Sequence, residues 1–178
     1  MGNNAPVSIL YPPNLLSIAS DSLHNWINMA WILHRLMRKG NTMENKMFVT
    51  INDYQRLIGL IEFSSIKSRY PDLIDRLLRD LKTAKMLAQE NISSKIVTMN
   101  SRVRLKELSS GKEKDITIAY PHDANGKEGR ISVVSHAGAA LLGRQEGDTV
   151  SWRVPGGVGE FEIVKIIFQP EAAGDYYL

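Results

Sequence analysis

The chain has 178 residues, 43% of them hydrophobic and 23% charged, which is the composition of a globular protein with room for one ordinary domain or two small ones. It contains no cysteine, and this excludes disulfides, thiolate metal ligands and a cysteine nucleophile. The formal net charge of +3 is too small to bind nucleic acid through phosphate neutralisation, so strong direct nucleic-acid binding is not expected.

A membrane span and an export signal are not expected either. The longest apolar stretch, 26–37, is shorter and more polar than the roughly 20 apolar residues that a bilayer requires. Its basic residues follow the apolar run, whereas those of a secretory signal precede it. We therefore expect a cytoplasmic protein without a membrane partner.

Residues 1–42 are interpreted as a translated leader that does not belong to the natural protein. An internal methionine, Met43, stands just before the regular part of the chain, and Arg38-Lys39-Gly40 is compatible with purine-rich codons like those of a ribosome-binding site. The alternative is a genuine amphipathic helix, Ser17 to Lys39, that binds a partner or a membrane surface.

Residues 43–92 are predicted to form a short antiparallel helical hairpin. Asp53 is the expected N-cap of a first helix with apolar residues at helical spacing. The run 68–71 ends in proline, which cannot continue a helix but suits the first turn of the next one. Helical spacing of apolar residues then continues to Leu87 or Ala88.

Residues 93–178 are predicted to form an antiparallel β-domain with one small helix, so the fold class is α+β. Strands are expected where apolar and polar residues alternate between turn signals, and the small helix where alanine and leucine precede Gly143. The expected strands are 95–105, 115–120, 131–134, 149–154 and 159–168, and the expected helix is 137–142. The tyrosines of the C-terminal tail are expected to fold back and pack.

Several segments of this region resemble the Rnk proteins, named as regulators of nucleoside diphosphate kinase. The matching segments are 97–103, 135–143, 146–148, 154–157 and, most strongly, Phe168-Gln-Pro-Glu-Ala-Ala-Gly-Asp-Tyr-Tyr-Leu178. Rnk proteins are similar in turn to the Gre transcript-cleavage factors, GreA and GreB. The resemblance implies a coiled-coil hairpin followed by an FKBP-like domain.

The same resemblance implies RNA polymerase as the partner. It implies docking on the core enzyme at the rim of the secondary channel, in competition with Gre factors and without catalysis by the chain itself. The family's name further implies an influence on nucleoside diphosphate kinase, which altered transcription would exert indirectly. The residues that the resemblance places at the polymerase-facing surface are Ser135, His136, Gly138, Leu141, Leu142 and Asp148. Because Leu141 and Leu142 are adjacent on a predicted helix, we expect one in the core and the other exposed.

Asp72 and Asp75 are the candidate acids at the hairpin tip. Three residues apart on a helix, they can lie on one face and share a hard cation with carboxylates of a polymerase. The competing interpretation is that both simply favour the start of the second helix. No metal site is expected from the chain's own residues, because its four histidines have no ligand spacing, and no cofactor is expected.

Two other functions compete with polymerase binding alone. The first is a Gre-like transcript-cleavage or elongation factor that uses the tip acids. The second is an FKBP-like prolyl isomerase, which would need an aromatic-lined pocket, and fold alone does not carry that function.

Overall fold

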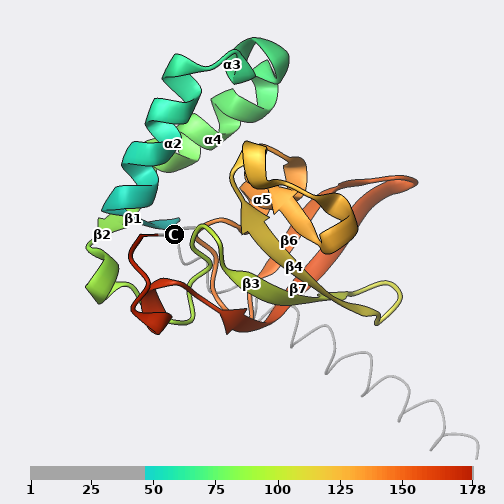
Figure 1. Cartoon of the computed structure of the whole chain (residues 1–178). Coiled ribbons are helices and arrows are strands. Elements are labelled where there is room, and N and C mark those ends of the chain that lie inside the picture. The colour runs from blue at the N-terminus through green and yellow to red at the C-terminus, as the bar shows by residue number, and fades with distance from the viewer. Residues whose placement is uncertain (1–46, 178) are drawn as a thin grey trace, which may run out of the picture. The chain divides into compact units, whose positions relative to one another are not determined.

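The computed structural model describes residues 47–177 and has an α+β fold (Figure 1). The predicted leader, 1–42, lies outside the described residues. Helices α2 (Ile51–Phe63), α3 (Ile66–Arg69) and α4 (Pro71–Thr83) precede a five-stranded sheet. The sheet consists of β3 (Arg102–Glu107), β4 (Glu113–Ala119), β5 (Arg130–Ser132), β6 (Thr149–Val154) and β7 (Gly157–Phe168), in the order β5-β4-β3-β7-β6.

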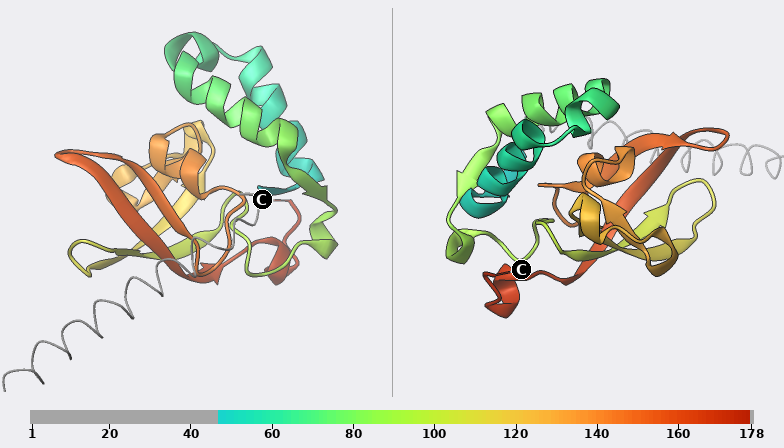
Figure 2. Two further views of the ribbon diagram at one scale, coloured as in Figure 1. Left: turned by 180° about the vertical axis from the view of Figure 1, so that it is seen from behind. Right: turned by 45° about the horizontal axis from the view of Figure 1, so that its top comes forward.

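Helices α2, α3 and α4 form a projecting segment that we call the helical arm, residues 51–83. In Figures 1 and 2, α2 and α4 lie side by side, and α3 joins them at the end remote from the sheet. Thr50 is the N-cap of α2, and its hydroxyl accepts a hydrogen bond from the Asp53 amide at 2.9 Å. The prediction of Asp53 as N-cap is therefore wrong, and Asp53 lies inside the first turn. Pro71 opens α4 as predicted.

A pair of short parallel strands closes the base of the arm. β1 (Phe48–Thr50) precedes α2, and β2 (Lys85–Leu87) follows α4. The second helix was predicted to continue to Leu87 or Ala88, but α4 ends at Thr83. It ends there because Ala84 takes an extended conformation and the next three residues pair with β1. The 3₁₀ turn η1 (Gln89–Asn91) then leads toward the sheet.

The sheet is mixed, because β4 and β5 pair in parallel while the other neighbours pair antiparallel. This corrects the prediction of a fully antiparallel sheet. The connection 120–129, with the 3₁₀ turns η2 (Pro121–Asp123) and η3 (Gly126–Glu128), carries the chain back so that β5 runs in the direction of β4. The short helix α5 (His136–Leu141) and the 3₁₀ turn η4 (Glu171–Ala173) complete the fold.

The first strand of the sheet is shorter than predicted and begins later. Val97 and Met99 are both buried, and so is Thr98 between them, so the chain before Arg102 does not alternate between two faces. Asn100 has a left-handed backbone with φ of 59°, and the Ser101 hydroxyl accepts a hydrogen bond from the Thr98 amide. Residues 98–101 therefore form a turn, and only the part from Arg102 onward pairs as β3.

One hydrophobic core joins the arm to the sheet. The arm contributes one face of each long helix, with Leu57 and Ile61 from α2 and Ile74, Leu77 and Leu81 from α4. The sheet and its connections contribute Val97, Met99, Val103, Leu105, Ile116, Ile118, Val133, Leu141, Leu142, Phe161 and Ile163. Within residues 47–177, no helix is long and apolar enough to cross a bilayer.

Candidate functional site

The carboxylate of Asp53 joins the base of the arm to the sheet domain. It is only 4% exposed. One oxygen, Oδ2, accepts a hydrogen bond from the Met99 amide at 3.2 Å, and the other, Oδ1, accepts one from the Tyr120 hydroxyl at 3.4 Å. A buried carboxylate is costly unless hydrogen bonds replace its water. Asp53 therefore ties α2 to two separate segments of the sheet domain.

The pKa values of the buried acidic groups around this contact are raised. Burial raises the pKa of Asp53, and the hydrogen bond from Met99 opposes that rise. Burial and the nearby Asp53 carboxylate raise the pKa of Tyr120 to about 12, so the hydroxyl keeps its proton and remains a donor. Glu171 of η4, which accepts a hydrogen bond from the Thr98 hydroxyl at 2.7 Å, also has a pKa raised by burial. Two buried carboxyl groups thus hold the arm and the C-terminal tail against the turn 98–101.

The remote end of the arm is exposed and carries both candidate tip acids. Asp72 lies in the first turn of α4, whereas Asp75 begins the second turn, so the prediction that both lie in the first turn holds only for Asp72. Both side chains are exposed. Phe63, at the end of α2, is 90% exposed, and Tyr70 at the start of α4 is 47% exposed. Sequence reasoning missed these two aromatic side chains, although the end of an apolar stripe at a helix terminus was the signal for them.

Helix α5 contains most of the residues predicted to face a polymerase. Ser135 is its N-cap, and the hydroxyl accepts a hydrogen bond from the Gly138 amide at 3.0 Å. Gly138 is buried against β5, where a Cβ atom would overlap the Ser132 carbonyl. His136 is exposed at the start of the helix. Of these three residues, His136 therefore has the side chain available at the surface, while Ser135 and Gly138 shape the helix.

Leu141 and Leu142 are both in the core, with exposures of 0% and 2%. The prediction that one of them is exposed is wrong, because α5 ends at Leu141 and Leu142 takes an extended conformation with ψ of 129°. Leaving the helical path turns the second side chain inward as well. Asp148 uses its Oδ2 to accept a hydrogen bond from the Gln145 amide at 2.8 Å, closing the turn before β6. Leu141 and Leu142 therefore contribute to the core, and Asp148 shapes a turn.

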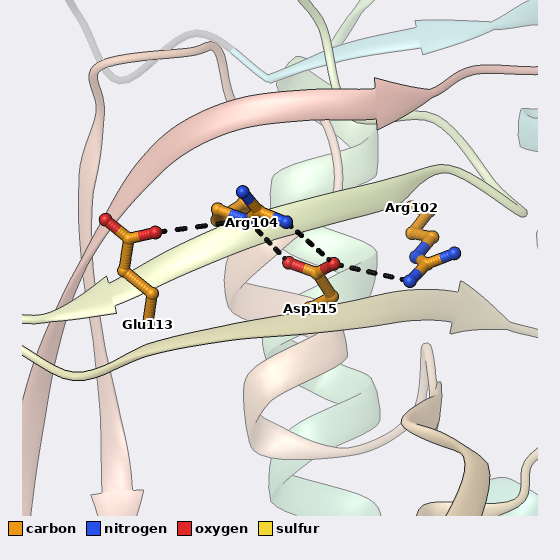
Figure 3. Close-up of polar contacts among 4 residues, drawn as sticks. All are labelled: Arg102, Arg104, Glu113 and Asp115. Atoms are coloured by element: carbon orange, nitrogen blue, oxygen red, sulfur yellow. Dashed lines mark hydrogen bonds and ion pairs between the residues drawn. The ribbon is translucent and has the colours of Figure 1, made fainter.

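The solvent-facing side of β3 and β4 carries a group of ion pairs (Figure 3). Arg104 binds the two carboxylate oxygens of Asp115 through Nε at 2.8 Å and Nη2 at 3.1 Å, and Arg102 contacts the same carboxylate at 3.3 Å. Hydrogen bonding by Arg104 lowers the pKa of Asp115. Exposed pairs contribute little to stability, so we interpret the group as fixing the charge pattern of this face.

Two of the aromatic residues that could line an isomerase pocket are packed against each other. The rings of Trp152 and Phe161 stack with centroids 3.9 Å apart and an angle of 4°. Lys114 lies over the Phe161 ring, with Nζ 4.7 Å from its centroid. A ring pair that is closed in this way leaves no aromatic-lined opening between Trp152 and Phe161 for a proline side chain.

The C-terminal tail is anchored differently from the expectation. Tyr177 is 94% exposed and Tyr176 is 38% exposed, so the tyrosines do not pack in the core. Gln169 is buried instead, and its amide donates a hydrogen bond to the Ile96 carbonyl at 2.8 Å. The tail is therefore held by polar contacts near its beginning, at Gln169 and Glu171.

No cluster of three or more histidine, aspartate or glutamate side chains suited to a metal ion occurs in residues 47–177. Of the four histidines, His24 and His34 lie outside that range. Both tip acids would therefore need ligands from another molecule to hold a cation between them.

Comparison with known proteins places this geometry in a defined class. Residues 92–168 match the family described as "Transcription elongation factor, GreA/GreB, C-term". The solved structure of a prokaryotic GreA/GreB elongation factor from Nitrosomonas europaea superposes with a TM-score of 0.61 at 35% identity, covering 69% of this chain and 100% of that one. The GreA factor of Syntrophomonas wolfei is 31% identical over 108 residues, which are 59% of this chain and 68% of that protein. The fold is thus that of the GreA/GreB class.

A finer assignment comes from the regulator of nucleoside diphosphate kinase of Escherichia coli K12. It is 41% identical over 107 residues, which are 60% of this chain and 79% of that protein. The chain belongs to the Rnk family, the branch of the GreA/GreB class that carries this name. The resemblance predicted from segments such as 135–143 and 168–178 is confirmed.

Proposed function

We propose that this protein is a transcription regulator that binds RNA polymerase and has no catalytic activity of its own. The relatives named as elongation factors support a role in transcription, and the observation that carries the proposal is the helical arm fixed on a GreA/GreB-type domain by Asp53. In this proposal the sheet domain corresponds to the FKBP-like domain of the Gre factors, and the arm to their coiled-coil hairpin. The domain limits 43–92 and 93–178 belong to the same proposal.

The docking site we propose is the rim of the secondary channel of core polymerase. The surface around α5, with His136 exposed and Ser135 and Gly138 shaping the helix, would contact the rim. An effect on nucleoside diphosphate kinase would then follow indirectly from altered transcription. A cytoplasmic location is part of this proposal, since the partner is found there.

Competition with a Gre factor tests the proposal. Labelled protein is titrated with core RNA polymerase, and unlabelled GreA is then added. We expect saturable binding that GreA displaces, and weaker binding for His136→Ala. The control is Arg153→Ala, an exposed change on the edge strand β6. Absence of binding at micromolar concentrations, or binding that GreA does not displace, would contradict the proposal.

Transcript cleavage by the tip acids is the alternative that the exposed Asp72 and Asp75 keep open. The long helices of the arm have 13 residues each, which at the helical rise is about 20 Å. We expect this reach to be too short to bring the tip acids to the polymerase active site. Cleavage of backtracked RNA that rises on adding the protein, and falls with Asp72→Asn but not with Asp80→Asn farther along α4, would favour the alternative.

A further inference from the structure

The C-terminal tail, residues 169–177, follows β7 and runs to the base of the helical arm (Figure 1). It begins as a compact turn, because the amides of Ala173 and Asp175 donate hydrogen bonds to the Pro170 carbonyl at 3.0 and 2.9 Å. Gly174 reverses the chain with a left-handed φ of 75°. The tail is therefore folded, with hydrogen bonds of its own.

The tail binds the segment that leads from the arm to the sheet, residues 88–101, which we call the connection. The side-chain amide of Gln169 donates a hydrogen bond to the Ile96 carbonyl at 2.8 Å. The Glu171 carboxylate accepts one from the Thr98 hydroxyl at 2.7 Å. Gln169 and Glu171 are only 3% and 9% exposed. Because buried polar groups require partners of this kind, the first half of the tail is tied to the connection.

The base of the arm binds the same connection. Asn52 donates a hydrogen bond from its Nδ2 to Gln89 Oε1 at 2.6 Å, and the Asp53 carboxylate accepts one from the Met99 amide at 3.2 Å. Met99 directly follows Thr98, whose hydroxyl is bonded to the tail. The arm and the tail therefore hold neighbouring residues of the connection.

Gln89 joins the arm and the tail through a single side chain. Its Oε1 accepts the hydrogen bond from Asn52, and its Nε2 donates one to the Tyr176 carbonyl at 3.2 Å. The next residue, Tyr177, lines a cleft of about 700 Å³ together with Arg56 and Leu60 of α2. The end of the tail therefore lies beside the first helix of the arm.

These polar contacts differ in kind from the core packing between the arm and the sheet. Apolar packing is not directional, so it permits small rotations of a helix pair more readily than hydrogen bonds with a preferred length and angle do. The contacts of Asn52, Asp53 and Gln89 all lie at the base of the arm. A small rotation there displaces the remote end of the arm much farther.

We propose that the C-terminal tail is a strap that fixes the orientation of the helical arm, and that release of the tail lets the arm rotate on the sheet domain. The tail holds the connection, and the connection holds Asn52 and Asp53 at the start of α2. Such coupling is reciprocal, so a partner that displaces the arm also weakens the attachment of the tail. The inference does not depend on polymerase binding, because the orientation of the arm is measured on the isolated protein.

The experiment measures the distance between the arm and the sheet domain in the 178-residue chain. Because the chain has no cysteine, Ser68→Cys in α3 and Ser109→Cys between β3 and β4 place one spin label on each part. Both serines are exposed. Pulsed electron paramagnetic resonance then gives the distribution of distances between the two labels. We expect a narrow distribution with the tail intact and a broader one when the contacts of the tail are removed.

Two substitutions release the tail at different points, so either one is sufficient if the other does not fold. Glu171→Ala removes the acceptor of the Thr98 hydroxyl, and Gln169→Ala removes the donor to the Ile96 carbonyl. We expect each to broaden the distribution, and Glu171→Gln, which keeps an acceptor oxygen, to preserve the narrow one. Glu128→Ala, an exposed acid outside the tail and the arm, is the control. An unchanged distribution in a tail variant with native circular dichroism, or equal broadening by the control, would overturn the proposal.

Discussion

Asp53 and Met99 are 46 positions apart, yet the Asp53 carboxylate accepts a hydrogen bond from the Met99 amide inside the core. The amide belongs to a turn of the sheet domain, and the carboxylate to the first turn of the arm. The orientation of the arm is therefore determined by a specific polar contact as well as by apolar packing.

Replacing Asp53 should weaken the attachment of the arm to the sheet domain and lower the stability of the protein. Asp53→Ala removes the acceptor of two buried donors, which costs about 1–3 kcal/mol for each group left unpaired. We expect a lower free energy of unfolding in urea and faster amide exchange at Met99. Tyr120→Phe removes the 3.4 Å hydrogen bond to Asp53 and leaves the Met99 contact in place, so it should cost less, about 1 kcal/mol. Equal stability of Asp53→Ala and the unaltered protein would show that the contact does not hold the arm.

Stability should respond to pH through the buried carboxyl groups. The pKa of Asp53 is raised in the folded protein, so the unfolded chain releases this proton first as pH rises. The contribution of Asp53 to folding is thus fully present below its unfolded pKa and is lost as pH rises through the folded value. We expect the stability difference between the unaltered protein and Asp53→Asn to fall over that window and then become constant. Asp115, whose pKa is lowered, has the opposite sign: its contribution is lost as pH falls.

Two glycine substitutions should act in opposite directions. Gly138→Ala places a Cβ against the Ser132 backbone, and we expect a loss of about 1–3 kcal/mol. Gly59 lies in the middle of α2, and a Cβ atom added there would meet no neighbouring atom within 4 Å. Gly59→Ala should therefore gain up to about 1 kcal/mol from helix propensity. Thermal unfolding of the two variants measures both effects, and destabilisation by Gly59→Ala would mean that α2 is shaped by other contacts.

Truncation of Leu141 or Leu142 should lower the stability of the fold, because both side chains are buried. Leu141→Ala and Leu142→Ala each create a core cavity, and we expect losses of about 2–5 kcal/mol. The His136 side chain is exposed, so His136→Ala should change stability by less than about 0.5 kcal/mol. Urea unfolding distinguishes these cases. Comparable stability of all three variants would contradict the burial of the leucines.

The exposed aromatic side chain at the tip should matter for binding and not for folding. Phe63 is 90% exposed, so Phe63→Ala removes little buried area and should leave the unfolding midpoint unchanged. If the arm contacts polymerase through its tip, the same variant should bind core enzyme more weakly. Leu60→Ala, on the inner part of the same helix, is the comparison that should lower stability as well.

Local periodicity predicted the elements better than it predicted the site. The three-and-four spacing around Leu57 and Ile61 indicated the buried face of α2, and Pro71 marked the start of α4. The expectation for Asp53 was wrong because Thr50, three residues earlier, serves as the cap and Asp53 finds partners 46 and 67 positions away. No local pattern contains contacts of that range.

The adjacent leucines show a second limit of periodicity. The rule that neighbours on a helix point in different directions applies to Leu141, but Leu142 is already extended. A helix boundary one residue earlier reverses the expected orientation, and boundaries are the least certain part of a pattern. The parallel pairing of β4 with β5 was missed for a related reason, because the connection 120–129 has no regular period of its own.

The pairing of β1 with β2 gives the arm a mechanical property. The two ends of the helical arm are joined at its base by this pairing. At the same place the Phe48 amide donates a hydrogen bond to the Gly143 carbonyl at 3.2 Å. Because its two ends are joined, one long helix of the arm cannot easily bend without the other. A force applied at Phe63 or Asp72 is therefore transmitted to the sheet domain. Displacement of the tip by a bound partner would then be transmitted to Gly143, two residues after the end of α5.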